Sequence, residues 1–461
     1  MKCSELRGLV RRFDLTGLRR WPWLSLAFWL LAAPDGRPVS GQPSAVFQGP
    51  TVISRGGEYR GRWRSLDAAT PAVTIKTTEP VTIVGSVIES RGPLIQSAVG
   101  HTRITVRDTT GRGLNPNVAG RCPGRFLSAE GFDSVEVRNN LIEGTSGIYL
   151  LEYRGSPPAS TKAKRQAGKA VVATVVVVGN RVRNVDGRRS DGRGGYLDFN
   201  DRRRAGERRA ESGYDVVQFL QLDKVRNVPG MEVAWNEVVN EPGLSRVEDN
   251  INIYLSSGTS ESPLRIHDNY VQGAFTVRPW QADTRDSDWE YDWSYSGGGI
   301  LLGDGSSPSA DGASSHVRAE RNQVVSTTNY GVAVSSGHDL EFAHNRVLSC
   351  GRLPDGRAIA GQNVGAYIWD ADGGKKSGSF FNNRAHDNLL GWVGKEGKRN
   401  DWWIPDAASW ENNTHWEDPI TPETEAAELA LWWKKVAKAG ITIGPVPSQA
   451  PVGSVRKSSR R

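Results

Sequence analysis

Short stretches in which apolar and polar residues alternate recur along most of the chain, and many of them end in the same local pattern. The pattern is an apolar residue, two variable positions, an Asn, one variable position and a second apolar residue, as in Val137, Asn140 and Ile142. Alternation with period two predicts β-strands, so each pattern predicts two short strands that meet at a sharp bend. Six further examples carry Asn180, Asn236, Asn269, Asn322, Asn345 and Asn383 in the Asn position. Seven matches to one register predict an architecture of stacked repeats.

The Asn position and the spacing of the pattern predict the geometry of one repeat. Asn is among the few residues other than Gly that tolerate a left-handed backbone, so we expect it at the bend itself. On stacked coils, its side chain could pass hydrogen bonds along a ladder inside the protein. Successive Asn residues lie 23 to 56 residues apart, and the shortest interval predicts a bare coil to which the longer intervals add loops. Weaker versions of the pattern with Ser86 and Thr109 are also 23 residues apart.

These features resemble the right-handed parallel β-helix family, also called pectate-lyase-like, over roughly residues 45–400. The resemblance implies an all-β fold, a single-stranded right-handed parallel β-helix, and the motif count predicts about nine coils. A third strand per coil follows each Asn after a variable gap, and most of the inserted length falls in that gap. In proteins of this family, that loop and the adjoining strand form the ligand-binding face. The motif predicts the fold and says little about activity.

The N-terminal region predicts export. Arginine residues precede the apolar run Trp23–Ala33, which is too short to span a bilayer as a helix, so residues 1–41 are interpreted as a signal peptide. We therefore expect a secreted or periplasmic protein with no stable membrane association after the signal is cleaved. A retained signal anchor is the alternative interpretation.

The remaining chain divides into the β-helix at residues 44–400, a Trp-rich segment with a helix at residues 401–445, and a basic tail at residues 446–461 that we expect to be disordered. Thr421 and Pro422 predict the helix start, and Gly440 predicts its end. One apolar stripe runs along this helix, so we expect it to cap the open last coil, whose strand edges need cover.

Charge and cysteine content narrow the classes of partner. The net charge of +7 arises at the ends: residues 1–20 and 451–461 each carry +4, which leaves −1 for the rest. A near-neutral body predicts no nucleic-acid partner. Cys122 and Cys350 are too few for a cysteine zinc cluster, and no metal ligands are assigned from the sequence.

Candidate functional residues come from the third strand of each coil. If Ile251 and Ile253 face the core, strand alternation turns Asn250, Asn252 and Tyr254 outward. Together with the outward Tyr367 and Trp369 and with Trp289 from the acidic, aromatic insertion at 276–297, they form the candidate substrate-binding set. The acids expected along the same face, which form the candidate catalytic set, are Glu248, Asp249, Asp304 and Asp370.

Three reactions on a polysaccharide are compatible with this set. A glycoside hydrolase needs two carboxyl groups about 5.5 Å apart for retention or about 6.5–9.5 Å apart for inversion. A polysaccharide lyase needs a base, here Lys224, Arg246 or Arg278, and a group such as Ca²⁺ that neutralises the substrate carboxylate. Calcium would be held by Glu248, Asp249 and Asp304, and an epimerase would use similar parts.

Two alternatives without catalysis remain: a glycan-binding or surface scaffold protein with the same groove, and a purely structural surface protein. Asp304 lies in Gly303-Asp304-Gly305, a typical turn sequence, and Glu248 and Asp249 could simply cap a strand. The sequence therefore predicts a polysaccharide partner and leaves open whether the chain is an enzyme.

Overall fold

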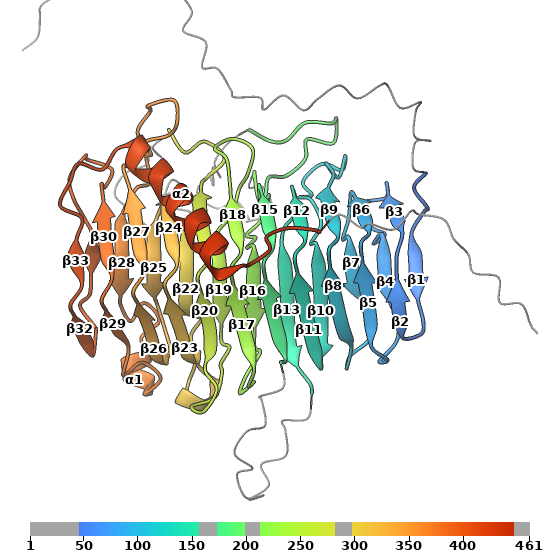
Figure 1. Cartoon of the computed structure of the whole chain (residues 1–461), viewed down its shortest axis with the longest axis horizontal. Coiled ribbons are helices and arrows are strands. Elements are labelled where there is room, and N and C mark those ends of the chain that lie inside the picture. The colour runs from blue at the N-terminus through green and yellow to red at the C-terminus, as the bar shows by residue number, and fades with distance from the viewer. Residues whose placement is uncertain (1–45, 156–172, 199–212, 282–296, 447–461) are drawn as a thin grey trace, which may run out of the picture. The chain divides into compact units, whose positions relative to one another are not determined.

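The computed structural model describes residues 46–155, 173–198, 213–281 and 297–446, which belong to one compact unit, Val46–Arg461. Its strands form three sheets of 11 strands each, and every pairing within a sheet is parallel. Each coil contributes one strand to each sheet, and successive coils stack in sequence order (Figure 1). The fold is the predicted right-handed parallel β-helix.

The strands are grouped here by sheet. The first sheet contains β1 (Thr51–Ile53), β4 (Val73–Ile75), β7 (Ile95–Ser97), β10 (Leu127–Phe132), β13 (Ile148–Tyr153), β16 (Leu220–Asp223), β19 (Asp249–Tyr254), β22 (Gly298–Asp304), β25 (Tyr330–Val334), β28 (Val364–Ile368) and β31 (Trp402–Trp403). The second contains β2 (Gly57–Tyr59), β5 (Val81–Val84), β8 (Arg103–Arg107), β11 (Ser134–Arg138), β14 (Val175–Val178), β17 (Met231–Ala234), β20 (Leu264–His267), β23 (Ser315–Glu320), β26 (His338–Ala343), β29 (Arg384–His386) and β32 (Ser409–Glu411). The third contains β3 (Arg62–Ser65), β6 (Val87–Ser90), β9 (Thr110–Gly113), β12 (Leu141–Glu143), β15 (Arg181–Arg183), β18 (Glu237–Val239), β21 (Tyr270–Ala274), β24 (Gln323–Thr327), β27 (Arg346–Ser349), β30 (Leu389–Trp392) and β33 (Thr414–His415). The described helices are η4 (Ala310–Gly312), α1 (Gly374–Ser377) and α2 (Pro422–Ala439).

Apolar residues at alternate strand positions build the core between the three sheets. Val135 and Val137 of β11 pair in register with Ile104 and Val106 of one neighbouring coil and with valines of the other. All of these side chains are buried in one continuous hydrophobic cluster that extends along the coils. Burial of this apolar surface is the main force that holds the coils together.

A ladder of polar side chains runs through the turn between the second and third sheets. From Asn180 onward, each amide oxygen accepts hydrogen bonds from the backbone N–H and the Nδ2 group of the Asn in the previous coil, as Asn236 does from Asn180 at 3.1 and 2.9 Å. The members of the ladder are Ser86, Thr109, Asn140, Asn180, Asn236, Asn269, Asn322, Asn345, Asn388 and Asn413. The predicted ladder is confirmed at six of its seven Asn positions, Asn140 to Asn345, and it includes Ser86 and Thr109.

Two details of the predicted turn are wrong. The left-handed conformation belongs to the residue before each ladder position. Asp268 and His344, for example, have φ of 56° and 54°, and each is followed by a ladder Asn. These preceding residues form a second file, which we call the turn column: Gly85, Asp108, Asn139, Gly179, Trp235, Asp268, Arg321, His344, Asp387 and Asn412.

The last ladder assignment was also wrong. Asn383 instead bonds to Leu340 and Gly337, and Asn388 takes the ladder position because Ala385, Asn388 and Leu390 repeat the same pattern.

The β-helix is longer than the motif count predicted. Eleven coils are present because residues 46–65 and 402–415 supply complete coils whose turns lack the full Asn pattern. The last of these coils lies in the Trp-rich segment, so the β-helix continues beyond residue 400 through β33.

The C-terminal helix forms as predicted, but it lies elsewhere. Thr421 caps the start of α2 and Gly440 ends it in the left-handed conformation. Instead of covering the last coil, α2 lies across the outer side of the third sheet, where Trp432 is buried against Tyr270 (Figure 1). The residues after α2 continue along the turn column and bond to Asn139 and Gly179. Across the described parts of the chain, no helix combines the length and hydropathy needed to cross a bilayer.

Candidate functional site

The candidate site lies on the outer side of the first sheet, around β19, β22 and β25. Ile251 and Ile253 belong to the core, so Asn252 and Tyr254 point outward as predicted. Asn252 is nevertheless only 2 % exposed, and Tyr254 is half-buried beside Asp304 in the neighbouring coil.

Asn250 faces inward, so its predicted role in substrate binding is wrong. It is fully buried and hydrogen-bonded to Asn240 and to the carbonyl oxygen atoms of Gly273 and Gly298. The chain turns the corner from the third to the first sheet here, so two successive side chains, Asn250 and Ile251, face the interior. The alternation of inward and outward side chains is interrupted at this corner, so Asp249 lies on the outer side, where its carboxyl group accepts a hydrogen bond from Tyr330.

One amide group joins two carboxyl groups from adjacent coils. The Nδ2 atom of Asn252 donates to Oδ2 of Asp249 at 2.8 Å and to Oδ2 of Asp304 at 2.9 Å. The two carboxyl oxygen atoms therefore lie no more than 5.7 Å apart, the sum of these two distances. We call Asp249, Asn252 and Asp304 the carboxyl–amide cluster.

The environment of Asp249 favours the protonated acid. Burial, followed by the nearby charge of Glu248, raises the pKa of Asp249 to about 7, although hydrogen bonds from Tyr330 and Asn252 act in the opposite direction. Burial also raises the pKa of Asp304, with contributions from Asp372 and Glu248, while Asn252 and the N–H of Gly305 favour its ionised form. Asp304 is the more exposed of the two, so ionisation costs it less.

Neither the two proposed arginine bases nor the proposed calcium ligands fit their roles. Arg246 is fully buried and paired with Glu248 at 2.9 Å; burial lowers its pKa, but neighbouring groups led by Glu248 outweigh this and raise it. The hydrogen bonds that Arg278 donates to the Asp198 carboxylate likewise raise the pKa of Arg278. The two carboxyl groups of the cluster share an N–H donor between them, which a cation would have to displace. The described residues therefore do not fit a calcium site here.

The other predicted residues have separate surroundings. Asp370 accepts hydrogen bonds from the backbone of Gly374 and Lys375 at α1, so the structure gives it a local structural role. Trp369 is 36 % exposed and packs against Trp403 at a centroid distance of 5.1 Å. Trp289 lies outside the described residues, and Lys224 is exposed.

Sequence reasoning missed Tyr330 and Asp223. Tyr330 pairs in register with Gly298, and the hydroxyl group donates to Asp249. Asp223 lies beside Tyr254, accepts from the hydroxyl group of Tyr149 at 2.6 Å, and has a buried Oδ1 atom without a hydrogen-bond partner in the described structure. Alignment of the third strands by register would have identified both, because they share columns with the assigned residues.

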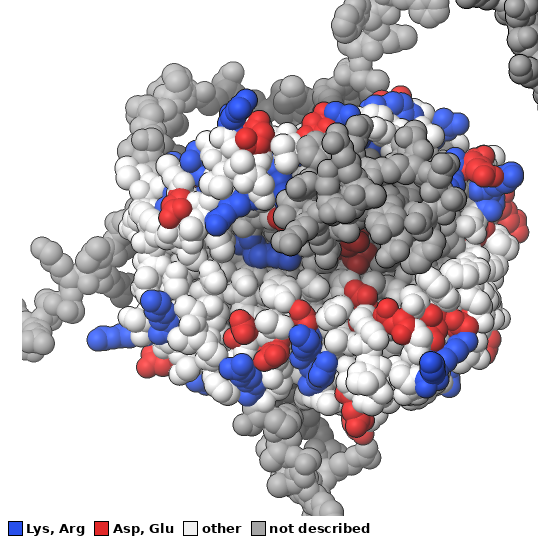
Figure 2. All heavy atoms as spheres, turned by 180° about the vertical axis from the view of Figure 1, so that it is seen from behind, with Lys and Arg blue, Asp and Glu red and all other residues white. Residues whose placement is uncertain are grey.

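The face opposite α2 carries many charged side chains. Figure 2 shows acidic side chains in a broken row across it, with Lys and Arg side chains interspersed. Among the described residues, one group of histidine and carboxylate side chains has metal-ligand spacing. It comprises His344, His386 and Asp387, which lie at or directly after the ends of β26 and β29 in the second sheet and do not belong to the carboxyl–amide cluster.

The chain was compared with models of protein families, with curated proteins and with solved structures, and none of the three comparisons produced a match.

Proposed function

We propose that this protein is an exported glycoside hydrolase that acts on a polysaccharide through Asp249 and Asp304. The observation that carries the proposal is the carboxyl–amide cluster, in which one Asn252 nitrogen limits the separation of the two carboxyl oxygen atoms to 5.7 Å. Retaining glycosidases use carboxyl groups about 5–5.5 Å apart, and inverting ones need about 6.5–9.5 Å. The spacing therefore favours retention.

The two acids take different roles because their surroundings differ. Asp249, with its raised pKa, is the general acid, and the more exposed Asp304 is the nucleophile. The Asp304 carboxylate bonds to the anomeric carbon as the glycosidic C–O bond breaks, and the leaving oxygen atom takes the proton of Asp249. Water then gives a proton to Asp249 while its oxygen atom displaces Asp304 from the sugar. Asn252 is a positioning residue that holds both carboxyl groups.

Hydrolysis is favoured over a lyase or epimerase reaction because neither of the two arginines proposed as bases is suited to take up a proton. Both arginine candidates have raised pKa values, and burial also raises the pKa of Tyr254 on the same face. A base for proton abstraction works best with a pKa near the operating pH. The proposal includes export, which the N-terminal sequence supports. It also includes a polysaccharide substrate and the finer likeness to pectate-lyase-like proteins, which the fold supports.

The test is release of reducing ends from a panel of neutral and uronate-containing glycans by the purified chain. We expect turnover by the wild type and a loss of at least about 1,000-fold in Asp304→Asn and Asp249→Asn, which keep side-chain shape and remove the acid. Asp355→Asn is the matched control, since Asp355 is an exposed carboxylate paired with Arg357. No product on the whole panel, or full activity in Asp304→Asn, would end the proposal.

Glycan binding without cleavage is the second candidate, and Trp369 and Trp403 favour it. Both indole rings are exposed, at 36 % and 47 %, and aromatic faces of this kind stack on sugar rings. Binding on the same panel without any product, abolished by Trp403→Ala, would support this candidate over hydrolysis.

A further inference from the structure

Two neighbouring turns place a histidine and an aspartate next to each other in the turn column. His344 and Asp387 occupy successive positions of this column with φ of 54° each, directly before ladder residues Asn345 and Asn388. The ladder fixes both turns, because the backbone N–H of Asn345 donates to the side chain of Asn388 at 2.9 Å. His386 precedes Asp387, and its carbonyl group accepts from the N–H of His344. The backbone therefore holds three potential metal ligands in adjacent coils.

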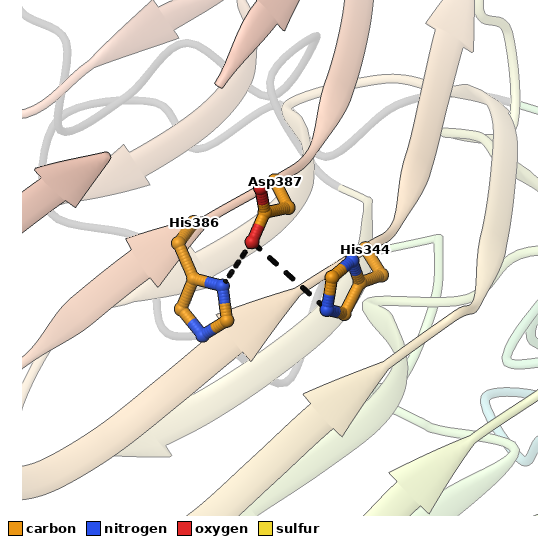
Figure 3. A group of neighbouring side chains, drawn as sticks. All are labelled: His344, His386 and Asp387. Carbon is orange, nitrogen blue, oxygen red and sulfur yellow. Dashed lines mark hydrogen bonds and ion pairs between the residues drawn. The ribbon is translucent and has the colours of Figure 1, made fainter. Parts of the chain in front are cut away.

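The three side chains converge on one point, as Figure 3 shows. Oδ2 of Asp387 lies 2.7 Å from Nδ1 of His386 and 4.0 Å from Nε2 of His344. One ligand atom of each residue lies within 4.8 Å of the others. Tetrahedral zinc with bonds of about 2.0–2.1 Å separates its ligand atoms by roughly 3.3 Å, which falls between the two separations measured from Asp387.

The surroundings of this group suit an exchangeable metal ion. A side-chain hydrogen bond connects Asp387 to Asn412, the next member of the turn column, and Glu341 lies 3.8 Å from Nε2 of His386. Such outer contacts orient metal ligands. The segment after α2 contacts the turn column at Asp108, Asn139 and Gly179, which belong to earlier coils than His344 and Asp387. The side chain of His344 is 52 % exposed, so solvent can reach the group.

We propose that His344, His386 and Asp387 bind a divalent transition-metal ion with the preferences of Zn²⁺. Two imidazoles and one carboxylate suit Zn²⁺, and three protein ligands leave a coordination position for water or another ligand. The ion would replace the proton that His386 and Asp387 share in their hydrogen bond. This site is independent of the carboxyl–amide cluster and of the proposed hydrolysis.

The test is a Zn²⁺ titration of the chelator-treated full chain by calorimetry. His344→Asn and Asp387→Asn are suitable variants because Asn occupies the same left-handed position at Asn139 and Asn412. His101→Asn is the matched control, since His101 is also left-handed, with φ of 57°, and forms a 2.9 Å pair with Asp133, but belongs to no metal-spaced group in the described chain. We expect one high-affinity site in the wild type and the control, and affinity at least tenfold weaker in both His344→Asn and Asp387→Asn.

Thermal unfolding of the same samples separates a lost site from a lost fold. Without metal, all three Asn variants should unfold within a few degrees of the wild type, and Zn²⁺ should raise the unfolding midpoint only for the wild type and the His101→Asn control. Absence of saturable binding by the wild type would overturn the proposal. Undiminished affinity in both His344→Asn and Asp387→Asn would overturn it equally.

Discussion

Asparagine is used in two contrasting ways in this molecule, in the ladder and in the carboxyl–amide cluster. Asn236 in the ladder donates to Val177 and to Asn269, and its oxygen atom accepts two hydrogen bonds from Asn180. Asn252 donates to two carboxyl groups, and its buried Oδ1 atom has no hydrogen-bond partner in the described structure. The hydrogen bonds of the ladder amide are thus satisfied, whereas the amide of the cluster keeps unused capacity, as expected where a ligand supplies the missing partner.

Two further polar groups, one at the end of β16 and one shortly before it, share the property of Asn252. Oε1 of Gln218 and Oδ1 of Asp223 are buried without a hydrogen-bond partner in the described structure. A buried polar atom left unpaired costs about 1–3 kcal/mol, and a bound ligand that supplies the missing partner would recover this cost. Among the described residues, no ladder side chain carries such an atom, and this distinguishes the cluster from the ladder.

The largest expected difference between the two regions is in stability. Asn236→Ala leaves the backbone N–H and Nδ2 of Asn180 and the carbonyl of Val177 without partners, which should lower the free energy of unfolding by at least about 3 kcal/mol. Asn252→Ala deprives Asp249 and Asp304 of one hydrogen bond each but also removes one unpaired buried oxygen atom, so the two effects partly cancel and the cost should be about 1–2 kcal/mol. Denaturant unfolding measures both. Equal losses in the two variants would contradict the distinction.

A smaller effect should appear in the pH dependence of stability. The pKa of Asp249 is about 7 in the folded chain and near 3.8 when unfolded, so the folded state retains a proton that the unfolded state releases between these values. Its contribution to stability is complete below about pH 4 and is lost as the pH rises through 7. Asp249→Asn has no such proton. The unfolding temperature of the wild type should therefore fall by about 2–4 °C more than that of Asp249→Asn between pH 5 and pH 8.

Parallel pH profiles for the wild type and Asp249→Asn would contradict the assignment of a protonated Asp249. Asp355→Asn serves as the control with the opposite sign, because hydrogen bonds from the Arg357 side chain and backbone lower the pKa of Asp355. The Asp355 carboxylate contributes to stability above its pKa in the unfolded chain, and this contribution is lost as the pH falls through its pKa in the folded chain. That loss lies below pH 5, so it does not affect the comparison between pH 5 and pH 8.

The smallest expected effect concerns the aromatic end of the first sheet. Trp403→Ala removes one exposed ring of the Trp369–Trp403 pair and should weaken glycan affinity by about fivefold to tenfold, the loss of one stacking contact. Stability should change little because the ring is 47 % exposed. Affinity electrophoresis on the glycan that the panel identifies would measure this, and unchanged mobility would exclude the tryptophan pair from binding.

Sequence patterns predicted the ladder because every coil repeats the same local constraint. They misplaced the left-handed residue because Asn in general tolerates the left-handed conformation. In this fold the Asn side chain is buried in the ladder, and the residue before it adopts the left-handed conformation that makes the turn. They assigned Asn383 instead of Asn388 because two matches to the pattern lie five residues apart in this coil. Only stacking on Asn345 distinguishes them.

The candidate site was less predictable than the fold. Strand alternation placed Asn252 and Tyr254 correctly and failed at Asn250, because a corner between sheets puts two consecutive side chains inside. Tyr330 was missed because its contact with Asp249 spans 81 residues of sequence, and no local pattern encodes a contact of that kind. The histidines near the Asn position gave no sign of a common site, since His344 and His386 come together only when their coils stack.

The anomeric configuration of the first product, followed by proton NMR during cleavage of a glycan from the panel, tests the central claim most directly. The account predicts retention, because the carboxyl oxygen atoms that Asn252 holds lie no more than 5.7 Å apart. A product released with inverted configuration would contradict the assignment of Asp249 and Asp304 as the catalytic pair.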